Sequence, residues 1–214
     1  MNKKFCIFDM DGTLVDSMGY WERLGIEYLM ERGVSQARAE QAFGQISSMT
    51  LLQAVEFMLD TLNLSGTPQE MIDGMQKVME NHYRQDVPLK PGIRDYLEKL
   101  KARGCRMCVA TATAEPLARI CLERLGIAHY FEFLLSCESI GVGKGSPDIY
   151  LMAAQKLGGT PEETAVFEDA LYAAQTAKSA GFYTVGVKDN GQRCHWSELS
   201  VLADEAAACW QDML

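Results

Sequence analysis

The spacing of hydrophobic residues changes twice along this chain of 214 residues. A short continuous apolar run, Phe5–Phe8, comes first and is typical of a strand buried on both faces of a parallel sheet. In residues 17–85, apolar side chains recur at helical spacing instead, as at Leu51, Val55 and Met58. Glycines and a Pro-containing stretch divide this region, so we predict about four helices there and no strand.

After residue 91, short apolar runs alternate with helical patterns, and this alternation determines the predicted fold class. We place strands near residues 105–111, 131–136, 164–168 and 182–187. Strands that alternate with helices form a parallel sheet covered by helices on both faces, with right-handed crossovers. We therefore predict an α/β protein with a doubly wound parallel sheet and a helical insert after its first strand.

Two carboxylates, Asp9 and Asp11, follow the first apolar run at a spacing of two. Residues i and i+2 of a strand point the same way, so both carboxylates are expected to face one spot beyond the strand end. Like charges held that close repel unless a cation or a shared proton compensates them. Mg²⁺ prefers carboxylate oxygens and substrate phosphate, so we predict a magnesium site here.

Three further polar segments stand at or after strand ends, where open parallel sheets bind their ligands. Thr111 ends the apolar run that begins at Arg106, Lys144 lies in a glycine-containing loop, and Glu168 and Asp169 end the run that begins near residue 164. Each of these three segments, like the Asp11-Gly12 pair, also has a simpler explanation. Asp-Gly pairs mark turns, threonine is common in strands, a loop lysine needs no role, and an acidic pair can cap a helix.

The four positions together resemble the four motifs of the haloacid dehalogenase (HAD) superfamily of phosphoryl-transfer enzymes. Asp9-Met10-Asp11-Gly12-Thr13 is similar to the DxDGT motif of that family. The other three motifs follow in the family's order, and together the four motifs cover nearly the whole chain. The resemblance implies a Rossmann-like core formed by residues 1–15 and 88–214. It also implies a small helical cap domain of the C1 type at residues 16–87.

The resemblance also implies a role for each motif. Asp9 would be the nucleophile that becomes an aspartyl-phosphate, and Asp11 the general acid and base. Lys144 would neutralise the charge of the nucleophile and of the phosphate, so it would both act in catalysis and bind the phosphate. Thr111 and the backbone of Ala112 would hold the phosphoryl group. The residues expected to bind Mg²⁺ are Asp9, Asp11, Glu168 and Asp169.

In the sequences of its motifs, the chain most resembles the beta-phosphoglucomutases and their phosphatase relatives. Those mutases carry a His, an Arg and a Lys where this chain has Trp21, Ser48 or a neighbour, and Ala114. Without these cationic groups a second phosphate is poorly bound, so we favour a phosphatase over a sugar-phosphate mutase. A dehalogenase is disfavoured because Asp11 is present. A non-catalytic binding protein is disfavoured because the expected catalytic side chains are intact.

A cap that closes over an active site admits small molecules, so we expect a small phosphomonoester as substrate. Tyr20, Trp21 and Ser48 are the candidate substrate contacts. The alternative for the two aromatic residues is simple packing, because aromatic residues at helical spacing more often belong to a core.

Composition limits the possible partners. The formal net charge of −9 argues against binding to nucleic acid or to anionic membranes. No run is long and apolar enough to cross a bilayer, and no signal peptide is evident. Seven scattered cysteines indicate reduced thiols in the cytoplasm, and Cys105 and Cys108, despite their redox-like spacing, are expected to be inert. Nothing in the sequence demands a partner subunit, so we expect a monomer.

Overall fold

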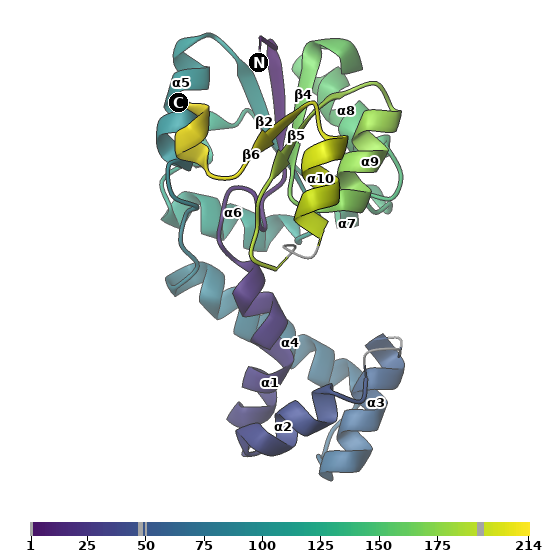
Figure 1. Ribbon diagram of the computed structural model, residues 1–214. Helices are drawn as coiled ribbons and strands as arrows, with labels where there is room; N and C mark the ends of the chain where they lie inside the picture. Colours follow the sequence, from purple (N-terminus) through teal and green to yellow (C-terminus); the bar gives the residue numbers. More distant parts are fainter. Residues whose placement is uncertain (1, 47–48, 50, 192–194) are drawn as a thin grey trace. The chain divides into compact units, whose positions relative to one another are not determined.

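The computed structural model describes the whole chain except residues 1, 47–48, 50 and 192–194. The chain divides into two compact units. The first comprises Met1–Met18 and Val87–Leu214, and the second comprises Gly19–Asp86 (Figure 1). The second unit is thus a single insertion into the first.

The first unit contains a six-stranded parallel sheet with the order β3-β2-β1-β4-β5-β6 (Figure 1). Its strands are β1 Phe5–Phe8, β2 Arg106–Thr111, β3 Leu134–Ser136, β4 Thr164–Glu168, β5 Tyr183–Val187 and β6 Glu205–Ala207. The chain adds strands to one side of β1 and then to the other, so the strand order reverses between β1 and β4. Open α/β sheets bind their ligands at such a switch point, outside the carboxyl ends of the strands.

Helices cover both faces of this sheet. They are α5 Ile93–Ala102, α6 Glu115–Arg124, α7 Cys137–Ile140, α8 Asp148–Leu157, α9 Leu171–Ser179 and α10 Trp196–Leu202. Short 3₁₀ turns occupy Ala128–Tyr130, Pro161–Glu163 and Trp210–Met213. Helix α8 packs on β1 and β2, and α9 packs on β4 and β5.

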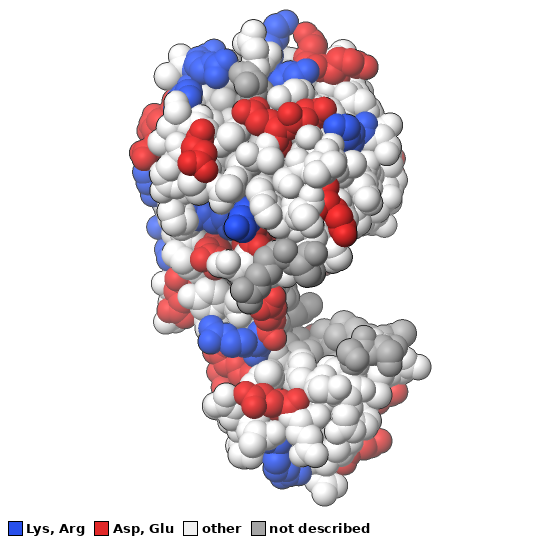
Figure 2. Space-filling model, viewed as in Figure 1, with Lys and Arg blue, Asp and Glu red and all other residues white. Residues whose placement is uncertain are grey.

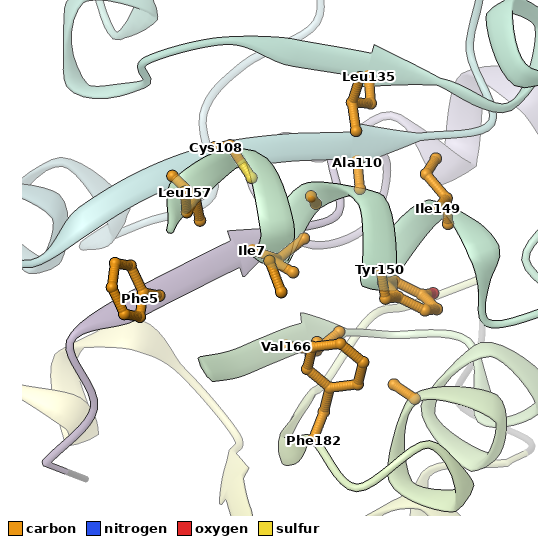
Figure 3. Close-up of a cluster of buried hydrophobic side chains, with 13 residues drawn as sticks. Phe5, Ile7, Cys108, Ala110, Leu135, Ile149, Tyr150, Leu157, Val166 and Phe182 are labelled. Atoms are coloured by element: carbon orange, nitrogen blue, oxygen red, sulfur yellow. The ribbon is translucent and has the colours of Figure 1, made fainter. Parts of the chain in front are cut away.

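The face of the sheet under α8 is a packed apolar cluster (Figure 3). Ile7, Ala110 and Val166 point to this face from three neighbouring strands, as the alternation of side chains along a strand requires. The full cluster is Phe5, Ile7, Cys108, Ala110, Leu135, Ile149, Tyr150, Ala153, Ala154, Leu157, Val166, Ala177 and Phe182. Removing these side chains from water is the main source of stability for this layer.

Aromatic side chains fill the opposite face. Phe8 stacks on Phe167 with ring centroids 4.2 Å apart, and Trp210 lies 6.2 Å from Phe8. Tyr96 of α5 contacts both Phe167 and Trp210. The indole N–H of Trp210 donates to the carbonyl of Thr13 at 3.1 Å, which fastens the loop after β1 to the core. The ends of β1 and β4 are therefore held on both faces by packed side chains.

The second unit is helical in its described part. Its helices are α1 Met18–Glu31, whose first residue still belongs to the first unit, α2 Gln36–Phe43, α3 Leu51–Leu62 and α4 Pro68–Gln85. Helix α4 begins with a capping box, in which the Thr67 side chain accepts the Glu70 N–H while the Glu70 carboxylate accepts the Thr67 N–H. Helices α1 and α4 approach closely at Gly74, because a Cβ there would lie 2.2 Å from the Tyr28 ring.

The structure confirms the predicted fold class, and it corrects two details of the sheet. The third strand is Leu134–Ser136, shorter than the predicted 131–136. The sixth strand, Glu205–Ala207, was not predicted, because an acidic and alanine-rich segment lacks the apolar pattern of a strand. It forms because its backbone pairs in parallel with β5.

Charged side chains of both signs are interspersed on the face shown in Figure 2. Among the described residues, no helix is sufficiently long and apolar to cross a membrane. The six cysteines that the structure describes are all free thiols. Cys108 is fully buried in the cluster of Figure 3, whereas Cys105 is only half-buried, so the two do not form an equivalent pair.

Candidate active site

The register of two neighbouring strands brings the acidic motifs together. Phe8 of β1 pairs with Phe167 of β4, so the residues that follow them, Asp9 and Glu168, lie beside each other. The Asp9 N–H donates to the Phe167 carbonyl at 3.0 Å and continues this ladder by one residue. Asp169 is the next residue along. All these positions are at the carboxyl edge of the sheet, at the point where the strand order reverses.

Asp9, Glu168 and Asp169 form a compact acidic cluster. One carboxylate oxygen from each lies within 4.8 Å of the other two, and the three side chains are buried, with at most 7% of any residue exposed. Gly12, with a φ of +81°, allows the loop after β1 to lie close to Asp169, because a Cβ at this position would lie 2.3 Å from Asp169 Oδ2. The Asp11-Gly12 pair therefore forms a turn, as its sequence predicts, and this turn is also part of the site.

Lys144 supplies the positive charge of the cluster. Its ammonium group, 5% exposed as a residue, is bonded to Asp9 Oδ1 and donates to Glu168 Oε1 at 2.6 Å. Burial alone lowers the pKa of a lysine, but the two carboxylates outweigh it and hold the pKa of Lys144 well above its ordinary value. Lys144 is therefore a permanent cation that bridges the ends of β1 and β4.

One lysine does not compensate three buried carboxylates. Burial raises the pKa of Asp9 to about 7; Lys144 opposes that rise, and Glu168 and Asp11 add to it. Burial likewise raises the pKa of Asp169, with further contributions from Asp9 and Glu168. With all three carboxylates ionised the cluster would have excess negative charge, which protons relieve in the metal-free protein and a divalent cation would relieve instead.

The donor set fits a hard divalent cation. The three residues offer only carboxylate oxygens, which suit Mg²⁺ rather than a soft metal. Glu168 Oε2 is buried and has no hydrogen-bond partner within the described part of the chain, although Oε1 has two. A buried carboxylate oxygen without a partner is costly, and coordination would satisfy it.

The raised pKa values predict that Mg²⁺ affinity depends on pH. Asp9 holds a proton in the folded, metal-free protein up to about pH 7, whereas an ordinary Asp, with a model value of 3.8, has already lost it. The metal-free fold therefore loses stability as pH rises between these two values. Mg²⁺ must displace the proton, so we expect its affinity to increase from pH 6 to pH 8.

Calorimetric titration of Mg²⁺ in buffers of different ionisation enthalpy measures both the affinity and the protons released. Proton release that is larger at pH 6 than at pH 8 is the expected result. Binding that is independent of pH, with no proton release at pH 6, would contradict the assignment of the excess charge to Asp9 and Asp169.

Asp11 lies outside this acidic cluster and is held by hydroxyl groups. Its Oδ1 accepts a hydrogen bond from Ser17 at 2.6 Å, and its Oδ2 accepts one from Thr113 at 2.7 Å. The side chain is half-buried. Sequence reasoning expected Asp11 to share the metal site, but the structure does not place its carboxylate among the three clustered ones.

The second motif provides donors beside Asp11. Thr111 ends β2 and is fully buried, and its Oγ1 accepts the backbone N–H of Thr113 at 3.0 Å. A threonine hydroxyl that accepts one hydrogen bond can still donate its own proton to another group. The neighbouring Ala112 is exposed. Sequence reasoning did not identify Thr113 and Ser17, although Thr113 could have been found from its spacing of two from Thr111.

The three candidate substrate contacts belong to the helical unit. Tyr20 is half-buried and lies 4.7 Å, between ring centroids, from the His82 ring. Trp21 is 37% exposed, and its indole N–H donates to the Tyr83 hydroxyl at 3.2 Å. Ser48 lies outside the described residues. Both aromatic side chains therefore make packing contacts within their own unit, consistent with the alternative that the sequence left open.

A nucleophile candidate, a bridging lysine and an acidic cluster at the switch point of a Rossmann-like sheet define a hydrolase of the phosphoryl-transfer type. Residues 3–181 match the family described as haloacid dehalogenase-like hydrolase. The chain belongs to this family, as the order of its four motifs predicted, and it is an HAD-type phosphohydrolase.

Several characterised proteins are similar over most of the chain. A phosphorylated carbohydrates phosphatase of Thermotoga maritima is 27% identical over 82% of this chain and 80% of its own length. A fructose-1-phosphate phosphatase of Escherichia coli is 28% identical over 85% of this chain and 95% of its own length. The structure of a beta-phosphoglucomutase from Clostridium difficile matches with a TM-score of 0.69 and 20% identity, over 99% of this chain and 93% of that one. At that identity the structural match shows a shared fold.

Proposed function

We propose that this protein is a Mg²⁺-dependent phosphatase that hydrolyses a small phosphomonoester through an aspartyl-phosphate on Asp9. One observation carries the proposal. Asp9, Glu168 and Asp169 converge within 4.8 Å, and Lys144 bridges the first two. Phosphoryl transfer depends mainly on positioning and charge neutralisation, and this arrangement provides both.

Asp9 is the nucleophile. Lys144 is bonded to its Oδ1, so it opposes the protonation of Asp9 that burial favours, and it offsets the negative charge of an approaching phosphate. The carboxylate attacks phosphorus and displaces the alcohol, which divides one difficult displacement into two easier ones. Mg²⁺, held by Asp9, Glu168 and Asp169, would supply further neutralisation of the carboxylates and the phosphoryl oxygens.

Asp11 is the general acid and base. Its two oxygens accept hydrogen bonds from Ser17 and Thr113, which fix its orientation. Asp11 gives a proton to the leaving oxygen and later takes one from the water that hydrolyses the aspartyl-phosphate. The Thr111 hydroxyl and the Ala112 backbone N–H donate to the phosphoryl oxygens, where charge accumulates in the transition state.

The substrate we propose is a phosphorylated sugar or a related small polyol phosphate. The support comes from the names of two similar proteins, a phosphatase of phosphorylated carbohydrates and one of fructose 1-phosphate. We assign the catalytic role to the unit that contains the sheet and the role of a cap to Gly19–Asp86. A cap over the site would exclude water and restrict the substrate to small molecules.

Release of inorganic phosphate from p-nitrophenyl phosphate and from a panel of sugar phosphates tests this proposal. We expect turnover that requires Mg²⁺, is abolished by chelation and is faster on at least one sugar phosphate than on p-nitrophenyl phosphate. A mutase would instead release little phosphate and would isomerise beta-glucose 1-phosphate once primed with the bisphosphate. Absence of both activities with Mg²⁺ present would leave only a binding role and would contradict the proposal.

A further inference from the structure

A phenol from outside the four motifs reaches the acidic cluster. Tyr150 lies on α8, and its hydroxyl donates to Glu168 Oε1 at 2.7 Å. Its place follows from strand alternation, because Val166 and Glu168 point to the same face of the sheet and α8 covers that face. The side chain of Tyr150 is completely buried.

The ring of Tyr150 is fixed by the hydrophobic core. Figure 3 shows it among the buried side chains between α8 and the sheet. It packs edge-on against Phe182, with ring centroids 6.2 Å apart, and belongs to the same cluster as Ile149 and Val166. A side chain held in this way presents its hydroxyl at one position. Burial and the neighbouring Glu168 carboxylate raise the pKa of Tyr150 above the ordinary value of a phenol, so the hydroxyl is protonated at neutral pH and acts as a donor.

Two donors converge on the same oxygen of Glu168. Lys144 donates to Oε1 at 2.6 Å and Tyr150 donates to it at 2.7 Å, whereas Oε2 has no partner within the described part of the chain. With Lys144 alone, the carboxylate could turn and present either oxygen to the ammonium group. The second donor, fixed by the core, removes that freedom.

We infer that Tyr150 is a positioning residue that orients Glu168 so that Oε2 faces the cation site. The inference rests on the proposed function, since it concerns the binding of Mg²⁺ to the same cluster. Groups that orient metal ligands typically change metal affinity by about 10- to 100-fold when they are removed. Tyr150 does not touch the reacting atoms, so its effect should appear in metal binding before it appears in chemistry.

Tyr150→Phe tests the inference with little change in shape. We expect the dissociation constant for Mg²⁺, measured by calorimetry without substrate, to rise about tenfold or more. The kcat at saturating Mg²⁺ should change less than about threefold, because no reacting group is altered. The matched control is Tyr130→Phe, since the buried Tyr130 also donates its hydroxyl to a carboxylate, that of Glu98, away from the site. The control should leave the Mg²⁺ affinity unchanged.

A second pair of variants separates orientation from packing. If Tyr150 acts through Glu168, then Tyr150→Phe should have no additional effect on Mg²⁺ affinity when Glu168 is already Gln. An affinity within twofold of wild type for Tyr150→Phe would overturn the inference. The inference would also be overturned if Tyr150→Phe lowered the Mg²⁺ affinity of the Glu168→Gln variant by the same factor as that of wild type. In either case, a wild-type protein that binds Mg²⁺ and hydrolyses phosphate esters would leave the proposed function intact, whereas a wild type that does neither would overturn both.

Discussion

Asp9→Asn is expected to lower kcat for phosphomonoester hydrolysis by at least about a thousandfold, because an amide does not form the aspartyl-phosphate. The loss should not come from unfolding. Above pH 7 the folded, metal-free protein must keep Asp9 ionised in a buried cluster that raises its pKa to about 7. Removing that charge should therefore leave the stability in the presence of a chelator equal to or above that of wild type.

Steady-state kinetics at saturating Mg²⁺ and thermal denaturation in a chelator provide the two readouts. Asp95→Asn is the control, because it makes the same chemical change at a carboxylate that is exposed on α5, away from the cluster. Activity that survives in Asp9→Asn would exclude Asp9 as the nucleophile. A large loss of stability would show that the low activity is a consequence of misfolding.

Lys144→Met is expected to lower both activity and stability. Lys144 is bonded to Asp9 and Glu168 in a buried environment, so its loss leaves carboxylates there without their cation. Removing one partner of a buried ion pair costs on the order of 3–5 kcal/mol. The cost should be smaller at pH 6 than at pH 8, because at the lower pH the carboxylates take up protons instead. Activity should fall at least about a hundredfold, since the phosphate loses a neutralising group.

Chemical denaturation at the two pH values, without metal, measures this loss of stability. The control is Lys178→Met, because Lys178 pairs with Asp204 where both side chains are about one-third exposed. Such a pair contributes no more than about 1 kcal/mol. A Lys144→Met protein as stable as the control at pH 8 would mean that the lysine does not compensate the acidic cluster.

Much of the site could be predicted from sequence because strand ends obey simple rules. An apolar run that ends in Asp9 and another that ends in Glu168 and Asp169 predict carboxylates at one edge of a parallel sheet. The strand register then brings them together. Lys144 required the family resemblance, because a lysine in a loop gives no sign of the carboxylates it will reach.

Other features depend on tertiary packing and left no pattern to read. Tyr150 belongs to the apolar face of a helix, and only the packing of α8 against the sheet turns its hydroxyl to Glu168. Asp11 looked equivalent to Asp9 by spacing. The chain, however, turns sharply after the strand at Gly12, and the Asp11 carboxylate meets Ser17 and Thr113 instead of the acidic cluster.

The central claim is that a carboxylate in a cation-binding cluster captures phosphorus, and trapping the phosphorylated enzyme tests it most directly. The protein is mixed with excess substrate and Mg²⁺, quenched rapidly in acid and mapped by mass spectrometry. We predict one added phosphoryl group on Asp9, labile to hydroxylamine, which is absent without Mg²⁺ and in Asp9→Asn. Turnover of the substrate with no phosphorylated Asp9 at any quench time, or with the phosphoryl group on another residue, would contradict the account.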